Sequence, residues 1–311
     1  MDDQKIQPKV DRVFNHLKIH NPVLLGKGGE GWIYEYGGDA LKIYPRNTDK
    51  QYLKNIQAFQ SVLAEQHFPF NTPQIFTVGE VDGILYTVEK RLQGVQMDKM
   101  MIGMSTVDRQ RLYRNYYDAI RQVNTVMFPD LPYGQIIQTP ESITSNSWTD
   151  FLIQTLDQKR IKTQDSMRRS VTDFDKKVEL FKSLIQHHLM STQKNLVHCD
   201  YFLNNVLVND DLSISAVFDF SAHTAVGDPK LDIAGVLTWN EIDPNAKPED
   251  YMFLYDVAKK DYGDDIEMYA DLYLLFSSFY FADMDDPSFS VKNLNNELLW
   301  NKYKQEPNDA V

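Results

Sequence analysis

The pattern of apolar and polar positions divides the chain into an N-terminal part made of short strands and a longer part dominated by helices. Residues 23–44 contain aromatic and β-branched segments separated by glycine turns, and this pattern predicts three strands. Residues 74–78 and 84–89 predict two more strands, joined by a turn. Between these two groups, residues 49–66 have the composition of a helix. The pattern therefore predicts a small, β-rich lobe at the N-terminus.

Helical periodicity dominates the rest of the chain. Residues 105–108 form a capping box, and apolar side chains recur behind it at helical spacing up to Val126. Further helices are predicted at residues 148–161, 171–190, 251–260, 266–282 and 294–303. The aromatic side chains of residues 269–281 are expected to lie in a helical core. The fold class is therefore α+β, with lobes at residues 1–92 and 93–311 that meet near Gln93 and Gly94.

Length and composition agree with one two-lobed protein. The 311 residues are 42% hydrophobic, which is enough to bury a large core. A single cysteine excludes a disulfide framework. The first residues lack a charged-then-apolar leader, and no apolar run approaches the roughly 18 residues that a membrane span requires. We expect a cytoplasmic protein with no membrane partner, either a monomer or a weak dimer.

The segment at residues 196–234 carries the clearest candidate chemistry. It contains His-x-Asp-x-x-x-x-Asn, which ends at Asn205, and then Asp219 at the start of Asp-Phe-Ser. The apolar triplets 206–208 and 216–218 predict the strands of a hairpin, with turn residues between them. Phosphoryl transfer needs an Asp to orient the attacking hydroxyl, and an Asn and an Asp to hold Mg²⁺. Asp200, Asn205 and Asp219 meet that need.

A glycine-rich segment at residues 26–31 satisfies G-x-G-x-x-G. A dinucleotide-binding loop would open a helix at this point, but the aromatic and β-branched residues 32–36 predict a strand, so the glycines lie between two strands. The next strand places Lys42 between apolar neighbours. An ammonium group is costly there unless a phosphate or a carboxylate pairs with it. We therefore expect Lys42 to hold phosphates.

Together these motifs resemble the aminoglycoside phosphotransferase and choline kinase family, the small-molecule branch of the protein-kinase-like fold. The motif Leu-Val-His-x-Asp, followed by Asn-Asn-Val-Leu, is most similar to that of the hygromycin phosphotransferases. The chain departs from the family at Cys199, where glycine is usual. Protein kinases place arginine there, so a side chain at this position is compatible with activity.

The resemblance implies a kinase-like pair of lobes that uses ATP or GTP with Mg²⁺. The implied catalytic residues are Asp200 as the base, Lys42, and His198 in a supporting role. The implied nucleotide-binding residues are Gly26, Gly28, Gly29, Gly31, Lys42, Glu89 and Arg91, the last two in a hinge at residues 88–92. The implied metal ligands are Asn205 and Asp219. Asp232 is expected to brace the catalytic loop.

One part of the family pattern is missing. Family members usually pair the strand lysine with a Glu on the following helix, but residues 49–64 contain no Glu. A glutamine, Gln57 or Gln60, could replace it, or Glu65 could serve from just beyond the helix. The partner of Lys42 therefore stays open.

Charge distribution bears on the acceptor. The whole net charge of −12 falls after residue 92, and residues 240–290 contain 13 acidic residues against three lysines. The resemblance makes this segment a wall of the acceptor site, where a negative field would attract a cationic hydroxyl acceptor such as an aminoglycoside. Nucleic acid is disfavoured because its phosphates would be repelled.

Other functions stay open. Choline, fructosamine-like, sugar and amino-alcohol acceptors use the same motifs. A catalytically silent nucleotide-binding module is a further alternative, because the helix Glu is missing and Cys199 replaces glycine. A protein kinase is disfavoured because no Ala-Pro-Glu segment follows Asp-Phe-Ser.

Overall fold

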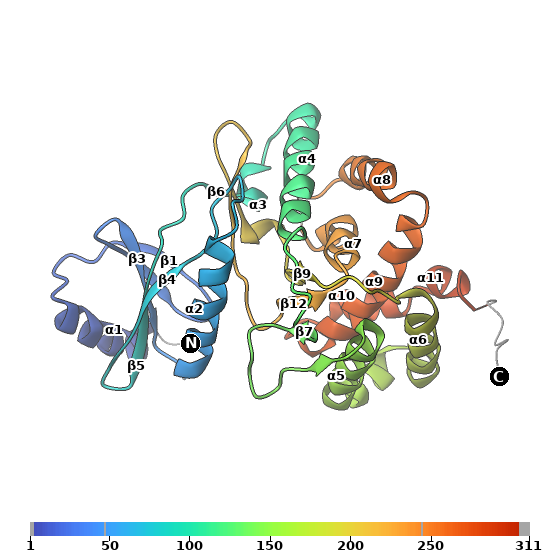
Figure 1. The fold of residues 1–311 in the computed structure, drawn as a ribbon, viewed down its shortest axis with the longest axis horizontal. Helices are drawn as coiled ribbons and strands as arrows, with labels where there is room; N and C mark the ends of the chain where they lie inside the picture. The colour runs from blue at the N-terminus through green and yellow to red at the C-terminus, as the bar shows by residue number, and fades with distance from the viewer. Residues whose placement is uncertain (1–2, 47, 244, 305–311) are drawn as a thin grey trace.

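A five-stranded antiparallel sheet forms the N-terminal part of the computed structural model, which describes residues 3–46, 48–243 and 245–304 (Figure 1). The strand order is β1-β2-β3-β5-β4. The strands are β1 Leu24–Lys27, β2 Trp32–Tyr36, β3 Asp39–Tyr44, β4 Ile75–Val81 and β5 Ile84–Glu89. The predicted three strands and the following strand pair are therefore confirmed.

Two helices cover the two faces of this sheet. Helix α1 (Asp3–Leu17) packs against the face that presents Leu41 and Ile43. Helix α2 (Lys50–Ala64) packs against the face that presents Tyr44, and it lies between the sheet and the helical part of the chain (Figure 1). Because side chains alternate along a strand, Lys42 points to the same face as Tyr44. The strand period thus places Lys42 toward the second part of the molecule.

The chain then crosses to the second part through β6 (Val95–Gln96), which pairs with β10 (Val206–Val208). Helix α3 (Met97–Met100) follows, and helix α4 (Thr106–Val123) begins at the predicted capping residue, Ser105. The Ser105 side chain accepts a hydrogen bond from the Asp108 backbone N–H. No observation tests the proposed lobe boundary at residues 92 and 93, which stays a prediction.

Helices make up most of the remaining chain. They are α5 Trp148–Ser170, α6 Phe174–His188, α7 Lys230–Thr238, α8 Pro248–Tyr262, α9 Ile266–Tyr280, α10 Ser288–Leu294 and α11 Glu297–Asn301, with 3₁₀ turns η1 Leu203–Asn205, η2 Trp239–Ile242 and η3 Phe281–Asp283. Helix α5 extends nine residues beyond the predicted end at residue 161. The prediction ended too early because the later turns of the helix are mostly polar and lack an apolar stripe. In the described part of the chain, no helix is long and apolar enough to cross a membrane.

Short strands position the catalytic segment. Strands β9 (Asn195–Val197) and β12 (Ala225–Gly227) pair within a small sheet with β7 (Tyr133–Gln135) and β8 (Thr144–Ser145). Strand β10 pairs with β11 (Ile214–Val217), which confirms the predicted hairpin, although its second strand begins earlier and ends one residue sooner than residues 216–218. The chain between β9 and β10 therefore begins and ends on buried strands.

Candidate active site

A cleft of about 920 Å³ is lined by residues from both the N-terminal sheet and the catalytic segment. It brings together most of the residues singled out from the sequence: Gly26, Gly28, Gly29, Lys42, Glu89, Arg91, Asp200 and Asp219. The other three, Gly31, His198 and Asn205, are not among the residues that line it. Residues that lie far apart in the sequence thus meet at one site.

Asp200 lies in the loop that follows β9. Its carboxylate accepts a hydrogen bond from Asn205 Nδ2 (3.3 Å), which also donates to the Asp200 backbone carbonyl (2.8 Å). Burial and the nearby charge of Asp219 raise the pKa of Asp200 to about 7, and the hydrogen bond from Asn205 opposes that rise. A carboxylate with a raised pKa is better matched to accepting a hydroxyl proton near neutral pH than an ordinary one.

Asp232 holds this loop from behind. Its carboxylate is fully buried and accepts hydrogen bonds from the backbone N–H groups of His198 (2.8 Å) and Cys199 (2.9 Å) and from the Asn124 side chain (2.8 Å). Burial raises its pKa to about 6. The expected bracing by Asp232 is therefore present. Cys199 adopts a positive φ of 63°, which explains why glycine would fit this position.

His198 is buried and contributes only to the geometry of the loop. Its Nε2 atom lies 3.0 Å from the Phe218 carbonyl, and its Nδ1 atom accepts a hydrogen bond of 3.3 Å from the Asp200 backbone N–H. These contacts assign the proton to Nε2. Burial lowers the pKa of His198 to about 4, so the ring is neutral at physiological pH. The ring orients both the Asp200 backbone and the residue before Asp219.

Asp219 follows Phe218 and has a positive φ of 69°. Its pKa is raised by burial and by Glu30. The Phe218 backbone N–H donates to the Asn205 carbonyl (3.1 Å). A backbone hydrogen bond therefore connects one candidate metal ligand, Asn205, to the residue that precedes the other, Asp219. No group of three or more His, Cys, Asp or Glu side chains that could hold a metal occurs within the described residues. Two oxygen donors suit Mg²⁺, which commonly completes its octahedron with substrate phosphates and water.

The glycine-rich loop lies between β1 and β2, as expected. A Cβ atom on Gly31 would lie 2.4 Å from the Ile43 carbonyl oxygen, so a larger residue would require the backbone to shift. Gly26 and Gly29 have no neighbour within 4 Å of the same construction. Arg46 Nη1 donates to the Gly29 carbonyl (2.7 Å). One glycine therefore packs the loop against β3, while others leave its outer part open.

The partner of Lys42 is none of the three residues that the sequence suggested, Gln57, Gln60 and Glu65. Lys42 Nζ forms an ion pair with Glu30 of the glycine-rich loop (2.7 Å). Gln57 donates to the Ile75 and Phe76 carbonyls, and Gln60 accepts from the Ile75 backbone N–H, so both glutamines fasten α2 to β4 instead.

Glu65 does not serve either, because it is the C-terminal cap of α2. Burial alone would lower the pKa of Lys42, but the nearby Tyr44, Glu30 and Glu89 raise it on balance. Lys42 is therefore charged and meets the electrostatic requirement of a phosphate-binding residue, and its partner, left open by the sequence, is Glu30.

The hinge segment also lies at the cleft. Residues 89–92 line it, together with apolar side chains that could enclose a planar base: Leu25, Ile33, Ala40, Ile75, Leu207 and Phe218. The Glu89 side chain is bonded to Thr87, and Arg91 is paired with Glu35 (2.8 Å). Glu89 and Arg91 therefore face the cleft region as predicted, but each side chain already has a protein partner.

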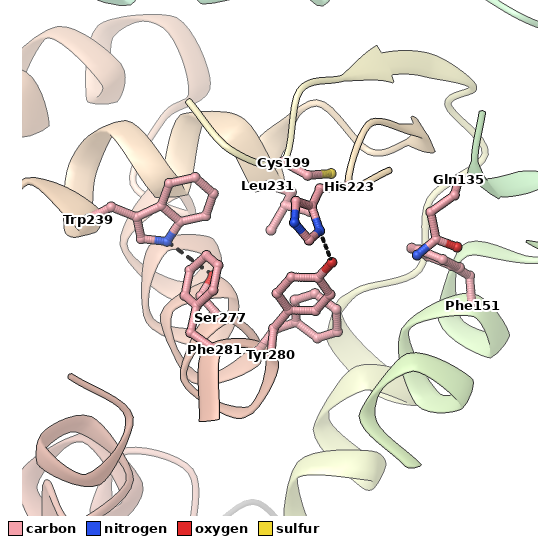
Figure 2. Close-up of a pocket in the computed structure, with 10 residues that line it drawn as sticks. Gln135, Phe151, Cys199, His223, Leu231, Trp239, Ser277, Tyr280 and Phe281 are labelled. Atoms are coloured by element: carbon pink, nitrogen blue, oxygen red, sulfur yellow. Dashed lines mark hydrogen bonds between the residues drawn. The ribbon is translucent and has the colours of Figure 1, made fainter. Parts of the chain in front are cut away.

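A second, smaller cavity of about 20 Å³ lies beside the catalytic loop (Figure 2). It is lined by Gln135, Phe151, Cys199, His223, Leu231, Trp239, Phe276, Ser277, Tyr280 and Phe281. Most of the aromatic residues 269–281 belong to helix α9 and pack in or against the core, as expected. Tyr273 and Phe279 are buried, but Tyr280 and Phe281 line this cavity. Sequence reasoning did not identify the cavity, because its walls come from six separate segments.

The acidic residues of segment 240–290 line neither of the two cavities in the part of the chain that the structure describes. Several of them form ion pairs: Asp250, Asp261, Asp264, Glu267, Asp271 and Asp283. Asp250 pairs with Arg109 inside the protein. The segment thus contributes a charged outer surface and structural ion pairs.

Comparison with known proteins identifies relatives over most of the chain. The model of the phosphotransferase enzyme family, APH, matches residues 25–263. Among solved structures, the GDP complex of wild-type aminoglycoside 2'-phosphotransferase-IIIa aligns with 96% of this chain and 99% of its own, at 15% identity and a TM-score of 0.65. No curated protein sequence matches this chain significantly.

Two further structures belong to proteins with other acceptors in their names. A Haemophilus somnus protein assigned as a fructosamine-3-kinase aligns with 94% of this chain and 97% of its own, at 17% identity and a TM-score of 0.62. A macrolide 2'-phosphotransferase type I aligns with 96% of each chain, at 15% identity and a TM-score of 0.57. These structures establish the predicted two-lobed, kinase-like fold. The narrower likeness to hygromycin phosphotransferases stays a prediction.

Proposed function

Since the chain belongs to the phosphotransferase enzyme family, we propose that it transfers the γ-phosphoryl group of ATP or GTP to a hydroxyl of a small molecule. The observation that carries this proposal is the cleft, in which Lys42 from the sheet and Asp200 and Asp219 from the catalytic segment line one space. Phosphoryl transfer depends mainly on positioning and charge neutralisation, and these three side chains supply both.

Asp200 is proposed to orient the acceptor hydroxyl and accept its proton. As the new bond forms between the acceptor oxygen and the γ-phosphorus, the bond from that phosphorus to the bridging oxygen breaks, and the nucleoside diphosphate leaves. The raised pKa of Asp200 suits this task. The hydrogen bond that Asn205 Nδ2 donates to the carboxylate, and the one that the Asp200 backbone N–H donates to His198 Nδ1, fix the direction of the carboxylate and its backbone. His198 therefore acts as a positioning residue.

The nucleotide is proposed to lie between the apolar walls of the cleft, with its phosphates near Lys42 and the glycine-rich loop. The ATP, ADP and GDP complexes of structural neighbours support a nucleotide co-substrate. Asn205 and Asp219 would hold Mg²⁺, which neutralises the charge of the phosphates. The mutual repulsion of the Asp200 and Asp219 carboxylates makes the site favourable for a cation.

The acceptor class is the finest part of the proposal. The acidic surface of residues 240–290 would favour the approach of a cationic amino sugar, and kanamycin, streptomycin and gentamicin complexes of neighbours agree with that class. The neighbours named as a fructosamine-3-kinase and as a macrolide 2'-phosphotransferase keep other acceptor classes open. The small cavity beside the catalytic loop, which Cys199 lines, has no carboxylate among its lining residues.

A metal-dependence experiment separates this enzyme from a silent nucleotide-binding module. With Mg²⁺ and ATP or GTP, the melting temperature should rise, and EDTA should abolish most of that rise. Asp219→Asn should weaken Mg²⁺-dependent nucleotide binding, whereas the control Asp211→Asn, in the β10–β11 turn, should not. Nucleotide binding that ignores both EDTA and Asp219→Asn would contradict the proposed metal ligands and favour the silent module.

A further inference from the structure

The cavity beside the catalytic loop lies next to the reaction centre. Cys199 lines this cavity, and its neighbour Asp200 lines the large cleft. His223 lines both spaces, so it marks the place where they meet. An acceptor whose hydroxyl reaches Asp200 therefore brings its adjacent atoms to the mouth of this cavity.

Several polar atoms of the residues that line the cavity bond to other protein groups. Figure 2 shows the His223 ring pointing toward Tyr280, whose hydroxyl is hydrogen-bonded to His223 Nδ1, and Trp239 Nε1 donating to Ser277 Oγ (3.1 Å). Gln135 accepts a backbone hydrogen bond through Oε1 (2.7 Å). The other lining side chains are aromatic or aliphatic, apart from the thiol of Cys199. Such walls favour an apolar group over a polar one.

Charge also disfavours an ammonium group here. No carboxylate is among the residues that line the cavity, so a buried cation would lack a partner. Lys159 Nζ lies 4.4 Å from the centre of the Tyr280 ring, on the wall of the cavity. Lys159 forms an ion pair with Asp283 (2.8 Å), so the Asp283 carboxylate already has a cationic partner and would not pair with an ammonium group in the cavity.

The volume limits what can enter. About 20 Å³ is little more than the space that one water-sized group occupies. Cys199 contributes to this limit, because its side chain projects into a space that glycine would leave empty. A positive φ at Cys199 makes glycine the unstrained residue for the backbone, so the cysteine side chain occupies this position at a conformational cost.

We propose that the acceptor carries a small apolar group, about the size of a methyl, close to its reacting hydroxyl, and that this cavity receives it. Cys199 then determines the largest group that fits. This inference rests on the proposed phosphotransfer function and narrows the acceptor to molecules that are uncharged at that position. The inference separates two effects: attraction of a cationic acceptor by the acidic surface of residues 240–290, and recognition of an uncharged group at the reaction centre.

The test uses sugar triads that differ at one position: D-fucose, D-galactose and 6-amino-6-deoxy-D-galactose, with the matching gluco and manno series. The three members carry methyl, hydroxymethyl and aminomethyl groups. Wild-type kcat/KM should be about tenfold higher for the methyl member, because an apolar pocket discriminates one small group by roughly that factor. Cys199→Gly should reduce the preference over hydroxymethyl to about twofold, whereas the control Cys199→Ser, which keeps the size, should retain most of it.

A binding readout covers the case in which no triad member is phosphorylated. Cys199 is the only cysteine, so methyl methanethiolsulfonate reports on the cavity alone. The Cys199 thiolate attacks the reagent's divalent sulfur, forms a methyl disulfide and releases methanesulfinate. Burial raises the pKa of this thiol, so labelling is followed by mass at alkaline pH. In nucleotide-bound protein, the methyl sugars should slow labelling several-fold more than their hydroxymethyl and aminomethyl partners.

Each outcome decides the matter. A wild-type preference for the aminomethyl member, an unchanged preference in Cys199→Gly, equal protection by all members, or a thiol that the reagent never reaches would overturn the cavity proposal. Failure of wild-type protein to bind ATP or GTP in a separate titration would overturn the proposed function instead. Nucleotide binding together with the expected protection supports the inference even where the panel lacks a turned-over acceptor.

Discussion

The catalytic loop at residues 198–205 and the glycine-rich loop at residues 26–31 lie on the same cleft but are held in opposite ways. The catalytic loop is fixed from inside by a buried carboxylate, Asp232, and by a stacked pair of tyrosines, Tyr116 and Tyr201, whose centroids lie 4.4 Å apart. Each tyrosine hydroxyl donates to the backbone carbonyl of the other.

The glycine-rich loop has few comparable supports. Its contacts with β3 and the segment that follows include the Arg46 hydrogen bond to the Gly29 carbonyl and the Glu30–Lys42 ion pair, both near the surface. The difference indicates which loop the protein holds in a fixed conformation before substrate binds. The group that must meet a developing charge is positioned before substrate arrives, which lowers the reorganisation cost of catalysis. The phosphate side keeps a loop that can adjust, with Glu30 pairing with Lys42 until phosphates replace it.

The largest effect should come from removing the proposed base in the rigid loop. Asp200→Ala should lower kcat by about 10³-fold, because general-base catalysis contributes roughly 10²–10⁴-fold. Nucleotide affinity, measured by titration with ATP and Mg²⁺, should change little. The fold should persist, because Asp232 and not Asp200 supports the loop. A variant that keeps more than about a tenth of wild-type turnover would show that Asp200 is not the base.

The support of the rigid loop is the second target. Asp232→Asn should destabilise the protein by about 2–4 kcal/mol, because an amide cannot accept all three hydrogen bonds and its NH₂ would face backbone donors. Turnover of the folded fraction should fall as well. Denaturant unfolding and kcat at a temperature where both proteins are folded measure the two effects.

The matched control is Asp228→Asn. Asp228 is equally buried and accepts hydrogen bonds from the Lys230 backbone N–H (3.0 Å) and the Tyr273 hydroxyl (3.2 Å), neither of which belongs to the catalytic loop. The Asp228→Asn variant should have a lower free energy of unfolding than wild type and should retain its kcat. Equal losses of turnover in the two variants would mean that Asp232 has no specific effect on the loop.

Sequence reasoning succeeded where function depends on local spacing. Asp200, Asn205 and Asp219 lie within one strand-loop-strand segment, so buried strands at fixed separations bring them together. Lys42 was placed by the alternation of a single strand. Helix α1 was not predicted, although Ile6, Val10 and Val13 recur at helical spacing.

It failed where a contact joins segments that the sequence does not relate. The Glu30–Lys42 pair depends on how the glycine-rich loop folds over β3, which no periodicity encodes. The small cavity combines Cys199, His223 and Trp239 with residues near Tyr280, and each of these alone has an ordinary structural explanation. Only the packing of α7 and α9 against the catalytic loop joins them into one surface.

A glycine pair tests how tightly the adaptable loop is attached to the sheet. Gly31→Ala should destabilise the protein by about 1–3 kcal/mol, because its Cβ would collide with the Ile43 backbone carbonyl and a backbone shift is required. Gly29→Ala should be within about 0.5 kcal/mol of wild type, because its Cβ meets open space. Thermal or denaturant unfolding measures both. Similar destabilisation of the two variants would show that the loop is fixed along its whole length.

The smallest expected effect concerns the ion pair that closes the adaptable loop. Glu30 is half exposed, so its pair with Lys42 should contribute no more than about 1 kcal/mol. If Glu30 competes with phosphates for Lys42, Glu30→Gln should tighten ATP binding by about twofold to fivefold, and the gain should diminish at high salt. The control Glu80→Gln removes a similar exposed pair with Lys50 (2.8 Å) away from the cleft and should leave ATP affinity unchanged. Weaker ATP binding in Glu30→Gln would mean that Glu30 positions Lys42 for the nucleotide, in the manner of the missing helix Glu, and that the glycine-rich loop is as preorganised as the catalytic loop.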